Sequence, residues 1–496
     1  MNGFSAESII TSKGDDYSYG VICDAGSTGT RMFLYRWTTK SDHELINITI
    51  ANDASGNPVV KKVSPGLSTF GKKPTEAAEY IRPLMELAEK NIPAEKILYT
   101  PVFIFATAGM RLIPKQEQEE VLRDLRTKLP HMTKMQVVKE HIRVIEGSWE
   151  GIYSWIAVNY ALVKFNGTER QNTVGMIDMG GASAQIAFEL PVGNDFMSSR
   201  VTNINLGCRE ENSPFKYKLF VTTFLGYGVN EGLRKYEQKI SDGMKNESVI
   251  DDVCMPKELS KTVARDDGSK FLRKGVGNWT QCVEKISAII DPVEKEGVCK
   301  IPSTRCYFGS VSAPKLSLSE MEFYGFSEYW YSTQDVLGLG GNYDFEKLKN
   351  KAQEFCEMKW DAIESSKANR FPDADDDRLR TQCFKSAWIS AVLHNGFSFD
   401  KMRNRFQSAQ KIAGQEVQWA LGAMIYNMRF FPLQSDDKNV IVSTVPASSM
   451  SMVPLLLGLG FIAFIVVVWY LTIKPKTPTF IMNPLYRLES GYNRFK

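Results

Sequence analysis

Two stretches of the chain, far apart in the sequence, share one plan. YGVICDAGSTGTRMFLYRW spans residues 19–37, and NTVGMIDMGGASAQIAFEL spans residues 172–190. Each has an apolar run that ends on an aspartate, then a segment of glycines with small and hydroxyl side chains, then a second apolar run. The two aspartates, Asp24 and Asp178, lie about one domain length apart. This duplication predicts two strand–turn–strand hairpins that face each other across a cleft.

A turn of this composition suits a phosphate group. Glycine allows the backbone to approach an anion, successive N–H groups can converge on it, and the carboxylate can hold a cation. A plain turn would explain a single copy, because short Asp-x-Gly segments are common. The second copy at domain spacing favours the phosphate site. The candidate phosphate-binding residues of the two turns are Gly26, Ser27, Thr28, Gly29, Gly180, Gly181 and Ala182.

Two further stretches lie between the copies. TPVFIFATAGMRLIP (100–114) is typical of a buried strand that ends near Thr107 and leads into a helix. VIEGSWEGIYSWIAVNYALV (144–163) indicates a turn at Gly147 and an amphipathic helix with one apolar face. Glu150 falls in the first turn of that helix. It either complements the helix N-terminus or acts as a general base beside the cleft, and its position leaves both open.

These four stretches, in this order, resemble the conserved regions of the apyrase, or nucleoside triphosphate diphosphohydrolase, family. FSEYWYSTQDVLGL (326–339) and QWALGAMIYNM (418–428) resemble two more of its segments. The resemblance covers nearly all of residues 19–430. It implies an α/β fold of the actin/Hsp70-like kind, with two RNase H-like domains and a nucleotide in the cleft between them. It also implies hydrolysis of a terminal phosphoanhydride by water.

The same resemblance implies roles for residues of these motifs. Glu150 matches the general base, and Ser183 and Gln185 match the pair that orients the attacking water. Asp24 and Asp178 match the carboxylates that hold a divalent cation, largely through its waters. Oxygen ligands and phosphate suit Ca²⁺ or Mg²⁺ rather than Zn²⁺.

The resemblance also implies contacts to the nucleotide. Thr107 is expected near the terminal phosphate, and Tyr331 matches the aromatic residue that stacks on the nucleobase. Phe397 is a candidate for the second face of the base. Arg31, on the strand after the first turn, either contacts phosphate or pairs with a nearby acid, and both remain open.

Details of the motifs resemble the intracellular, Golgi or lysosomal branch of the family. Gly29 stands where cell-surface members usually have histidine, and Gly226 stands where they have cysteine. This branch implies a preference for nucleoside diphosphates such as UDP and GDP. Removal of these products of glycosyltransferases would support glycosylation in the lumen. A general cell-surface or lysosomal apyrase that acts on ATP and ADP is the alternative.

The domain organisation follows from length and motif order. At 496 residues, the chain is too long for a single core. We expect domain I at 18–147 plus 411–432, and domain II, with a disulfide-stapled insert, at 148–410. The other expected parts are an N-terminal segment (1–17), a juxtamembrane stalk (433–451), a transmembrane helix (452–473) and a cytosolic tail (474–496).

The transmembrane helix is predicted from an uncharged apolar run long enough to cross a bilayer, MVPLLLGLGFIAFIVVVWYLTI. The tail after it is rich in Lys and Arg, which predicts a cytosolic tail and a lumenal catalytic region. Residues 1–20 contain no apolar stretch of the kind that export requires. We therefore expect an upstream anchor, in preference to a catalytic region that faces the cytosol. The expected location is the membrane of the Golgi or another endomembrane compartment.

The cysteines agree with an oxidising compartment. Cys23 lies in the first apolar run and is expected to be buried, while the others fall within 208–383 at spacings that fit no zinc site. The resemblance implies the pairs Cys254–Cys282, Cys299–Cys306 and Cys356–Cys383, with Cys208 unpaired. Four N-glycosylation sequons would be usable in that compartment; they begin at Asn47, Asn166, Asn246 and Asn278.

Other function classes are weighed against this one. The formal net charge of +3 gives no basic field for nucleic acid, and none is expected as a partner. A sugar or acetate kinase would share paired phosphate hairpins but would need an acid beside a metabolite. A nucleotide-gated binding module of the actin/Hsp70 type would need a partner-binding surface. Glu150 as a base with Gln185 beside the water favours hydrolysis over a kinase, for which a membrane anchor would also be unusual, and no partner-binding surface is evident in the sequence.

Overall fold

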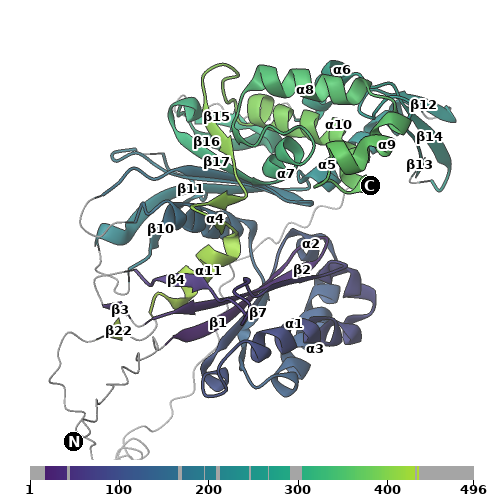
Figure 1. The fold of residues 1–496 in the computed structure, drawn as a ribbon. Coiled ribbons are helices and arrows are strands. Elements are labelled where there is room, and N and C mark those ends of the chain that lie inside the picture. The colour runs from purple at the N-terminus through teal and green to yellow at the C-terminus, as the bar shows by residue number, and fades with distance from the viewer. Residues whose placement is uncertain are drawn as a thin grey trace, which may run out of the picture. The chain divides into compact units, whose positions relative to one another are not determined.

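The first sheet lies in the N-terminal part of the computed structural model, where Figure 1 shows it in purple and blue. Its strand order is β4-β2-β1-β6-β7, and β5 pairs with β2. β1 and β2 form an antiparallel hairpin, whereas β6 runs parallel to β1 and β7 parallel to β6. The strands are β1 (Ser18–Ala25), β2 (Thr30–Trp37), β4 (Ile48–Ile50), β5 (Val60–Val63), β6 (Pro101–Ala106) and β7 (Gln136–Val144). Helices α1 (Ala77–Lys90) and α3 (Lys115–Met132) cover one face.

The second sheet repeats this arrangement. Its order is β10-β11-β9-β8-β17-β19-β18, in which β8 and β9 form the antiparallel hairpin. β17 runs parallel to β8, and β19 parallel to β17, as β6 and β7 do in the first sheet. The strands are β8 (Gly175–Met179), β9 (Ser183–Glu189), β10 (Val201–Asn205), β11 (Lys216–Leu225), β17 (Glu322–Ser327), β18 (Gly341–Asn342) and β19 (Arg405–Ser408). The predicted α/β fold with two equivalent hairpins is confirmed.

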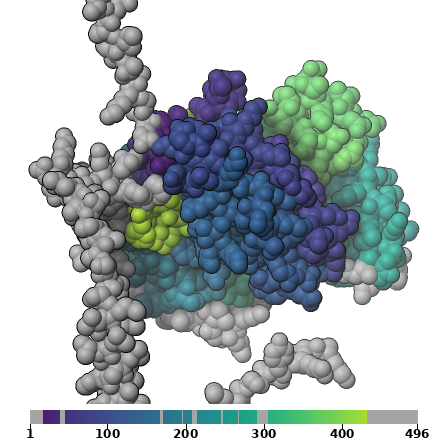
Figure 2. All heavy atoms as spheres, turned by 90° about the horizontal axis from the view of Figure 1, so that it is seen from below, coloured from purple at the N-terminus to yellow at the C-terminus, as the bar shows by residue number. Residues whose placement is uncertain are grey.

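The structure describes most of the chain between Tyr17 and Phe430. The described ranges are 17–38, 40–41, 45–165, 170–194, 196–207, 213–244, 247–265, 267–290, 304–430 and 433–434. The chain divides into units Met1–Asp436 and Asp437–Lys496, and all described residues belong to the first. The space-filling view in Figure 2 shows one face of it, much of which is formed by residues of the N-terminal third.

Helix α4 (Gly147–Ala161) lies between the second sheet and helix α11 (Trp419–Met428). It packs against β8, β9 and β11 on one side and against α11 on the other. Residues from Gly147 to Asn159 are therefore buried on most sides of the helix. The expected single apolar face is wrong for this reason, because a helix enclosed by a sheet and a second helix has no solvent side.

The remaining helices pack mainly in the C-terminal half, above the second sheet in Figure 1. They are α5 (Val229–Gly243), α6 (Trp279–Ile290), α7 (Glu328–Gln334), α8 (Phe345–Glu357), α9 (Trp360–Arg370) and α10 (Asp376–Ala391), while α2 (Ala108–Leu112) follows β6. The minor strands are β3 (Lys40–Ser41), β12 (Val249–Asp252), β13 (Ser260–Ala264), β14 (Lys270–Gly275), β15 (Thr304–Tyr307), β16 (Val311–Pro314), β20 (Lys411–Ile412), β21 (Gln415–Glu416) and β22 (Leu433–Gln434).

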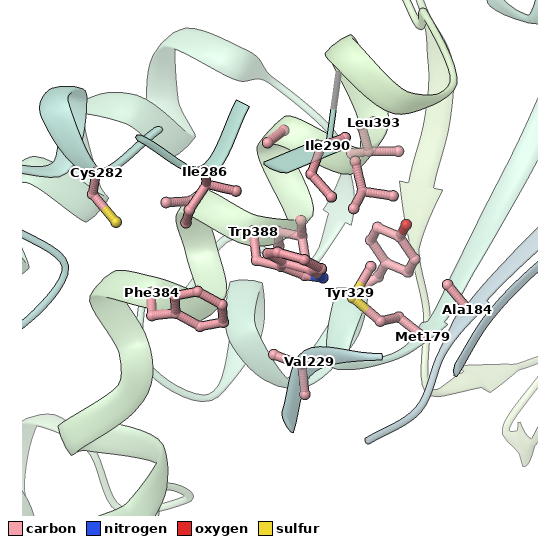
Figure 3. Close-up of a cluster of buried hydrophobic side chains, with 14 of the residues drawn as sticks. Met179, Ala184, Val229, Cys282, Ile286, Ile290, Tyr329, Phe384, Trp388 and Leu393 are labelled. Atoms are coloured by element: carbon pink, nitrogen blue, oxygen red, sulfur yellow. The ribbon is translucent and has the colours of Figure 1, made fainter. Parts of the chain in front are cut away.

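A core around Trp388 supports the second hairpin. Figure 3 shows this α10 side chain among buried side chains that include Met179 and Tyr329. Met179 follows Asp178 at the end of β8, and Tyr329 follows Glu328 at the start of α7. Close packing at both points restricts how far the ends of β8 and β17 can move.

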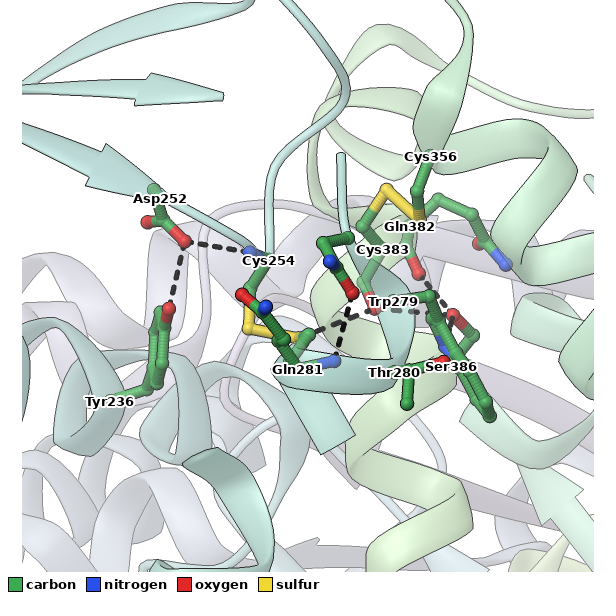
Figure 4. The surroundings of a disulfide bond; sticks show 12 residues. Tyr236, Asp252, Cys254, Trp279, Thr280, Gln281, Cys356, Gln382, Cys383 and Ser386 are labelled. Atoms are coloured by element: carbon green, nitrogen blue, oxygen red, sulfur yellow. Dashed lines mark hydrogen bonds between the residues drawn. A yellow bond between two sulfur atoms is a disulfide. The ribbon is translucent and has the colours of Figure 1, made fainter. Parts of the chain in front are cut away.

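Two of the predicted disulfides are present, Cys254–Cys282 and Cys356–Cys383. Figure 4 shows them around α6 and α10, where the Trp279 Nε1 group donates to the Ser386 hydroxyl at 2.9 Å. Cys306 is also disulfide-bonded, but its predicted partner Cys299 and the predicted free Cys208 lie outside the described residues. Cys23 is buried and free, as expected.

The predicted terminal segments are largely outside the described part of the chain. These are 1–17 except for Tyr17, 433–451 except for β22, the transmembrane helix 452–473 and the tail 474–496. In the described ranges, no helix combines the length and the apolar character needed to cross a bilayer. The predicted domain boundaries remain predictions.

Candidate active site

The two Asp-x-Gly turns have the same local geometry. Asp24 stands one residue before the end of β1, and Asp178 stands one residue before the end of β8. In the first turn the Gly26 N–H donates to the Gly29 carbonyl at 2.9 Å, and in the second the Gly180 N–H donates to the Ser183 carbonyl at 3.0 Å. The equivalence predicted from the sequence therefore extends to the closing hydrogen bond.

Two glycines of neighbouring segments pack closely against the backbone of the two turns. A Cβ atom on Gly66 would lie 2.2 Å from the Ser27 carbonyl oxygen, and a Cβ atom on Gly228 would lie 2.4 Å from the Ala182 nitrogen. No side chain can occupy these positions without displacing the turn, so glycine is needed there for close approach.

A cavity of about 200 Å³ separates the two turns. All of the predicted site residues except Gln185 and Phe397 line it. They are Asp24, Gly26, Ser27, Thr28, Gly29, Arg31, Thr107, Glu150, Asp178, Gly180, Gly181, Ala182, Ser183 and Tyr331. Gln185 instead contacts a cavity-lining residue, because its side-chain amide donates to the Ser183 hydroxyl at 2.6 Å.

Glu150 is held by an arginine that the sequence analysis did not single out. Arg111 Nη2 donates to Glu150 Oε2 at 3.0 Å and to the Ser183 hydroxyl at 3.3 Å. Arg111 Nη1 donates to the Ile145 carbonyl at 2.9 Å, which anchors the guanidinium to the end of β7. Burial raises the pKa of Glu150 to about 7, with Arg111 acting against the rise and Asp178 adding to it. A carboxylate with a pKa near neutrality suits proton acceptance from water.

The two aspartates fit a divalent cation. Burial raises the pKa of Asp24 to about 7, to which nearby Glu150 contributes, and burial also raises the pKa of Asp178. Within the described residues, Asp178 Oδ1 is buried without a hydrogen-bond partner. In the same part of the chain, no group of three His, Cys, Asp or Glu side chains could enclose a metal. Two carboxylates suit a hard cation that keeps waters and takes phosphate oxygens.

Arg31 forms an ion pair with an acid from the other end of the chain. Its Nη1 lies 2.9 Å from Glu416 Oε1, and the guanidinium also hydrogen-bonds to Tyr331. Of the two roles left open for Arg31, the structure contains the ion pair, and the residue also lines the cavity.

The aromatic candidates differ in their surroundings. Tyr331, on α7, lines the cavity, and the Arg378 guanidinium lies 4.6 Å from the centre of its ring. Phe397 is 0 % exposed and packs against Phe224 and Phe308. The expectation that Phe397 offers a second face to the base is wrong, because its ring is enclosed by the core.

Comparison with known proteins identifies the family of the chain. The family model described as GDA1/CD39 (nucleoside phosphatase) matches residues 10–443. The chain belongs to the GDA1/CD39 (nucleoside phosphatase) family. The predicted apyrase resemblance and the enzyme class, a nucleoside phosphohydrolase, are thereby confirmed.

Two curated relatives belong to Caenorhabditis elegans. The nucleoside-diphosphatase mig-23 is 62% identical over 451 residues, which are 88% of this chain and 81% of the relative. The nucleoside-triphosphatase ntp-1 is 45% identical over 429 residues, which are 86% of this chain and 76% of the relative. A crystal structure of nucleoside triphosphate hydrolases from Neospora caninum shares the fold, with a TM-score of 0.58 and 15% identity over 84% of this chain and 93% of that chain.

Several residues of this family member reach the cavity without having been predicted. Besides Arg111 behind Glu150, the cavity-lining ones are Lys62, Ala108, Met179, Asn230, Ser327, Glu328, Gln418 and Trp419. Most of them lie in or beside the motifs named in the sequence analysis, so these cavity-lining residues could have been found by considering every residue of each motif. Lys62 and Asn230 lie in no motif. Ser327 has a positive φ of 57°, a strained conformation that side chains other than glycine rarely adopt.

Proposed function

We propose that this family member hydrolyses the terminal phosphoanhydride of nucleoside diphosphates, chiefly UDP and GDP, and also of triphosphates. The observation that carries the proposal is the buried Glu150, which faces the cavity between two phosphate-type turns with its pKa near 7. The names of the relatives, a nucleoside-diphosphatase and a nucleoside-triphosphatase, support the substrate class.

In the proposed reaction, Glu150 accepts a proton from water as the water oxygen bonds to the terminal phosphorus. The bridging P–O bond breaks, and the nucleotide leaves with one phosphate fewer. Ser183 and Gln185 hold the water, and the 2.6 Å hydrogen bond between their side chains supports a shared role. Arg111 orients the Glu150 carboxylate and the Ser183 hydroxyl together. The backbone N–H groups of the two turns, with Ser27, Thr28 and Thr107, would cradle the phosphates.

Asp24 and Asp178 would hold Ca²⁺ or Mg²⁺, largely through its waters. When bound, this cation would neutralise charge on the phosphate oxygens. Tyr331 would stack on the nucleobase, and such stacking tolerates different bases. We also infer that the two sheets are the RNase H-like domains of an actin/Hsp70-like fold, which their repeated strand order supports.

We further propose a lumenal setting, in the Golgi or another endomembrane compartment. The apolar run 452–473 would anchor the chain, and the basic tail 474–496 would face the cytosol. The two disulfides, Cys254–Cys282 and Cys356–Cys383, support an oxidising compartment. Hydrolysis of UDP and GDP there would remove products of glycosyltransferases. A lysosomal or cell-surface apyrase is the competing assignment.

The test is phosphate release by the full chain in detergent, measured on UDP, GDP, ADP, UTP and ATP with Ca²⁺, Mg²⁺ or chelator. We expect metal-dependent release that is fastest on UDP or GDP and at least about a thousandfold slower in Glu150→Gln. Glu146→Gln is the matched control, because Glu146 lies exposed one turn earlier in the chain. Equal rates on ATP would favour a general apyrase. Unchanged rates in Glu150→Gln would refute Glu150 as the base.

A further inference from the structure

The charges that line the cavity are not balanced for an anionic ligand. Of the described residues that line it, Arg31 and Lys62 carry positive charge, whereas Asp24, Glu150, Asp178 and Glu328 are acids. Arg31 is already paired with Glu416. In the described part of the chain Lys62 forms no salt bridge, although the charges of Asp24 and Asp375 act on it. Of the two described cations that line the cavity, Lys62 is therefore the one that is available to bind a phosphate.

The sheet register points Lys62 towards the same space as Asp24. Asp24 of β1 lies directly opposite Arg31 of β2, and Arg31 lies directly opposite Lys62 of β5. Residues directly opposite each other share one face of a sheet, so the three side chains form a row on the face that lines the cavity. Arg31 and Lys62 are like charges in facing positions, and of the two only Arg31 has a salt-bridge partner, Glu416.

The turn itself leaves room for the lysine. A Cβ atom on Gly29 would lie 2.6 Å from the Val63 carbonyl oxygen and 2.8 Å from Lys62 Cε, so the β5 backbone and the lysine side chain both lie close to this glycine. Glycine at position 29 therefore lets Lys62 lie against the phosphate turn.

The neighbours of Lys62 place it at the nucleoside end of the cavity. Arg31, opposite Lys62, hydrogen-bonds to Tyr331, and Arg378, which lies over the Tyr331 ring, acts electrostatically on Lys62. Glu150 is instead held by Arg111, away from this group. We propose, on the basis of the proposed function, that Lys62 binds the phosphate that remains on the nucleoside monophosphate product.

The preceding residue provides a matched control. Lys61 lies on the same strand with its side chain on the opposite face, since successive strand residues alternate. Its Nζ lies 3.5 Å from the Pro83 carbonyl of α1. Lys61→Met and Lys62→Met remove the same charge from adjacent positions, so only a contact within the cavity distinguishes them.

The experiment measures UDP hydrolysis and calorimetric binding of UMP for the full chain and its variants. We expect Lys62→Met to raise both the KM for UDP and the Kd of UMP about tenfold, as the loss of a charge-assisted contact at a partly exposed site would. kcat should change less than about twofold, because the retained phosphate is bound alike in ground and transition states. Inhibition by inorganic phosphate should be unchanged. Lys62→Arg should stay within about threefold, and Lys61→Met should match the wild type.

Equal effects of Lys61→Met and Lys62→Met would overturn the proposal, because the loss of one positive charge, without any contact to the phosphate, would then explain both. A fall in kcat with unchanged KM would also overturn it, by assigning Lys62 to the transferred phosphate. If the wild type binds UMP but hydrolyses none of the nucleotides, the proposed function fails. In that case, UMP binding that is weaker in Lys62→Met but not in Lys61→Met would still support a contact between Lys62 and the phosphate of UMP.

Discussion

Arg111 sets the ionisation of Glu150, and its removal should move the pH dependence of the enzyme. The guanidinium lies 3.0 Å from the Glu150 carboxylate, and both side chains are largely buried. A single opposite charge at this distance lowers a carboxyl pKa by about one to three, or about 1.4–4 kcal/mol of differential stabilisation. Burial already raises the pKa of Glu150 to about 7 in the presence of Arg111. Arg111→Met should raise it further.

The sign follows from the role of Glu150 as a base. Only the ionised carboxylate accepts a proton, so kcat falls as the pH drops through this pKa. In Arg111→Met the acid limb of the kcat–pH profile should move to higher pH by about one to three pH units. At pH 7 and saturating metal, kcat should fall roughly five- to five-hundredfold, and much of the loss should be recovered at alkaline pH.

The assay is the kcat–pH profile for UDP hydrolysis between pH 5 and about 10. Arg111→Lys keeps a cation and should retain most of the wild-type acid limb. Arg126→Met is the matched control, since Arg126 donates to the Ile142 carbonyl of β7, three residues before the Ile145 carbonyl that Arg111 contacts, but contacts no site residue. An acid limb that stays at the wild-type pH in Arg111→Met would refute the reasoning, even if kcat fell.

Two further predictions concern other parts of the molecule. In Gly147→Ala the added Cβ would lie 2.3 Å from a threonine hydroxyl of β11, so the start of α4 must shift. Because Glu150 lies on α4, kcat should fall at least about tenfold. Gly243→Ala is the control, since its Cβ meets nothing within 4 Å, and it should leave kcat unchanged. Equal activity of the two variants would contradict this. Burial lowers the pKa of His394 to about 4, so between pH 6.5 and 4 the unfolded chain binds a proton that the folded chain does not. The melting temperature should therefore fall as the pH drops through this window, and less steeply in His394→Gln; identical slopes would refute the assignment.

Features that depend on neighbouring residues could be predicted from the sequence. Each Asp-x-Gly turn is closed by a hydrogen bond within a few residues, so its geometry follows from its local composition. The order of the motifs then indicated the family, the α/β fold and two disulfide pairs. Phe397 shows the limit of this approach. An aromatic residue near a motif can line a site or fill a core, and only the packing around it decides.

The sequence by itself determined the two turns and the carboxylates that they carry, because short-range backbone geometry sets them. The tertiary structure decided which charges meet. Arg31 and Glu416 are separated by 385 residues, and Arg111 reaches Glu150 from a different motif. Lys62 belongs to no motif and reaches the cavity through strand register alone. Ion pairing and burial depend on which surfaces of distant segments pack together, and local composition does not encode that choice.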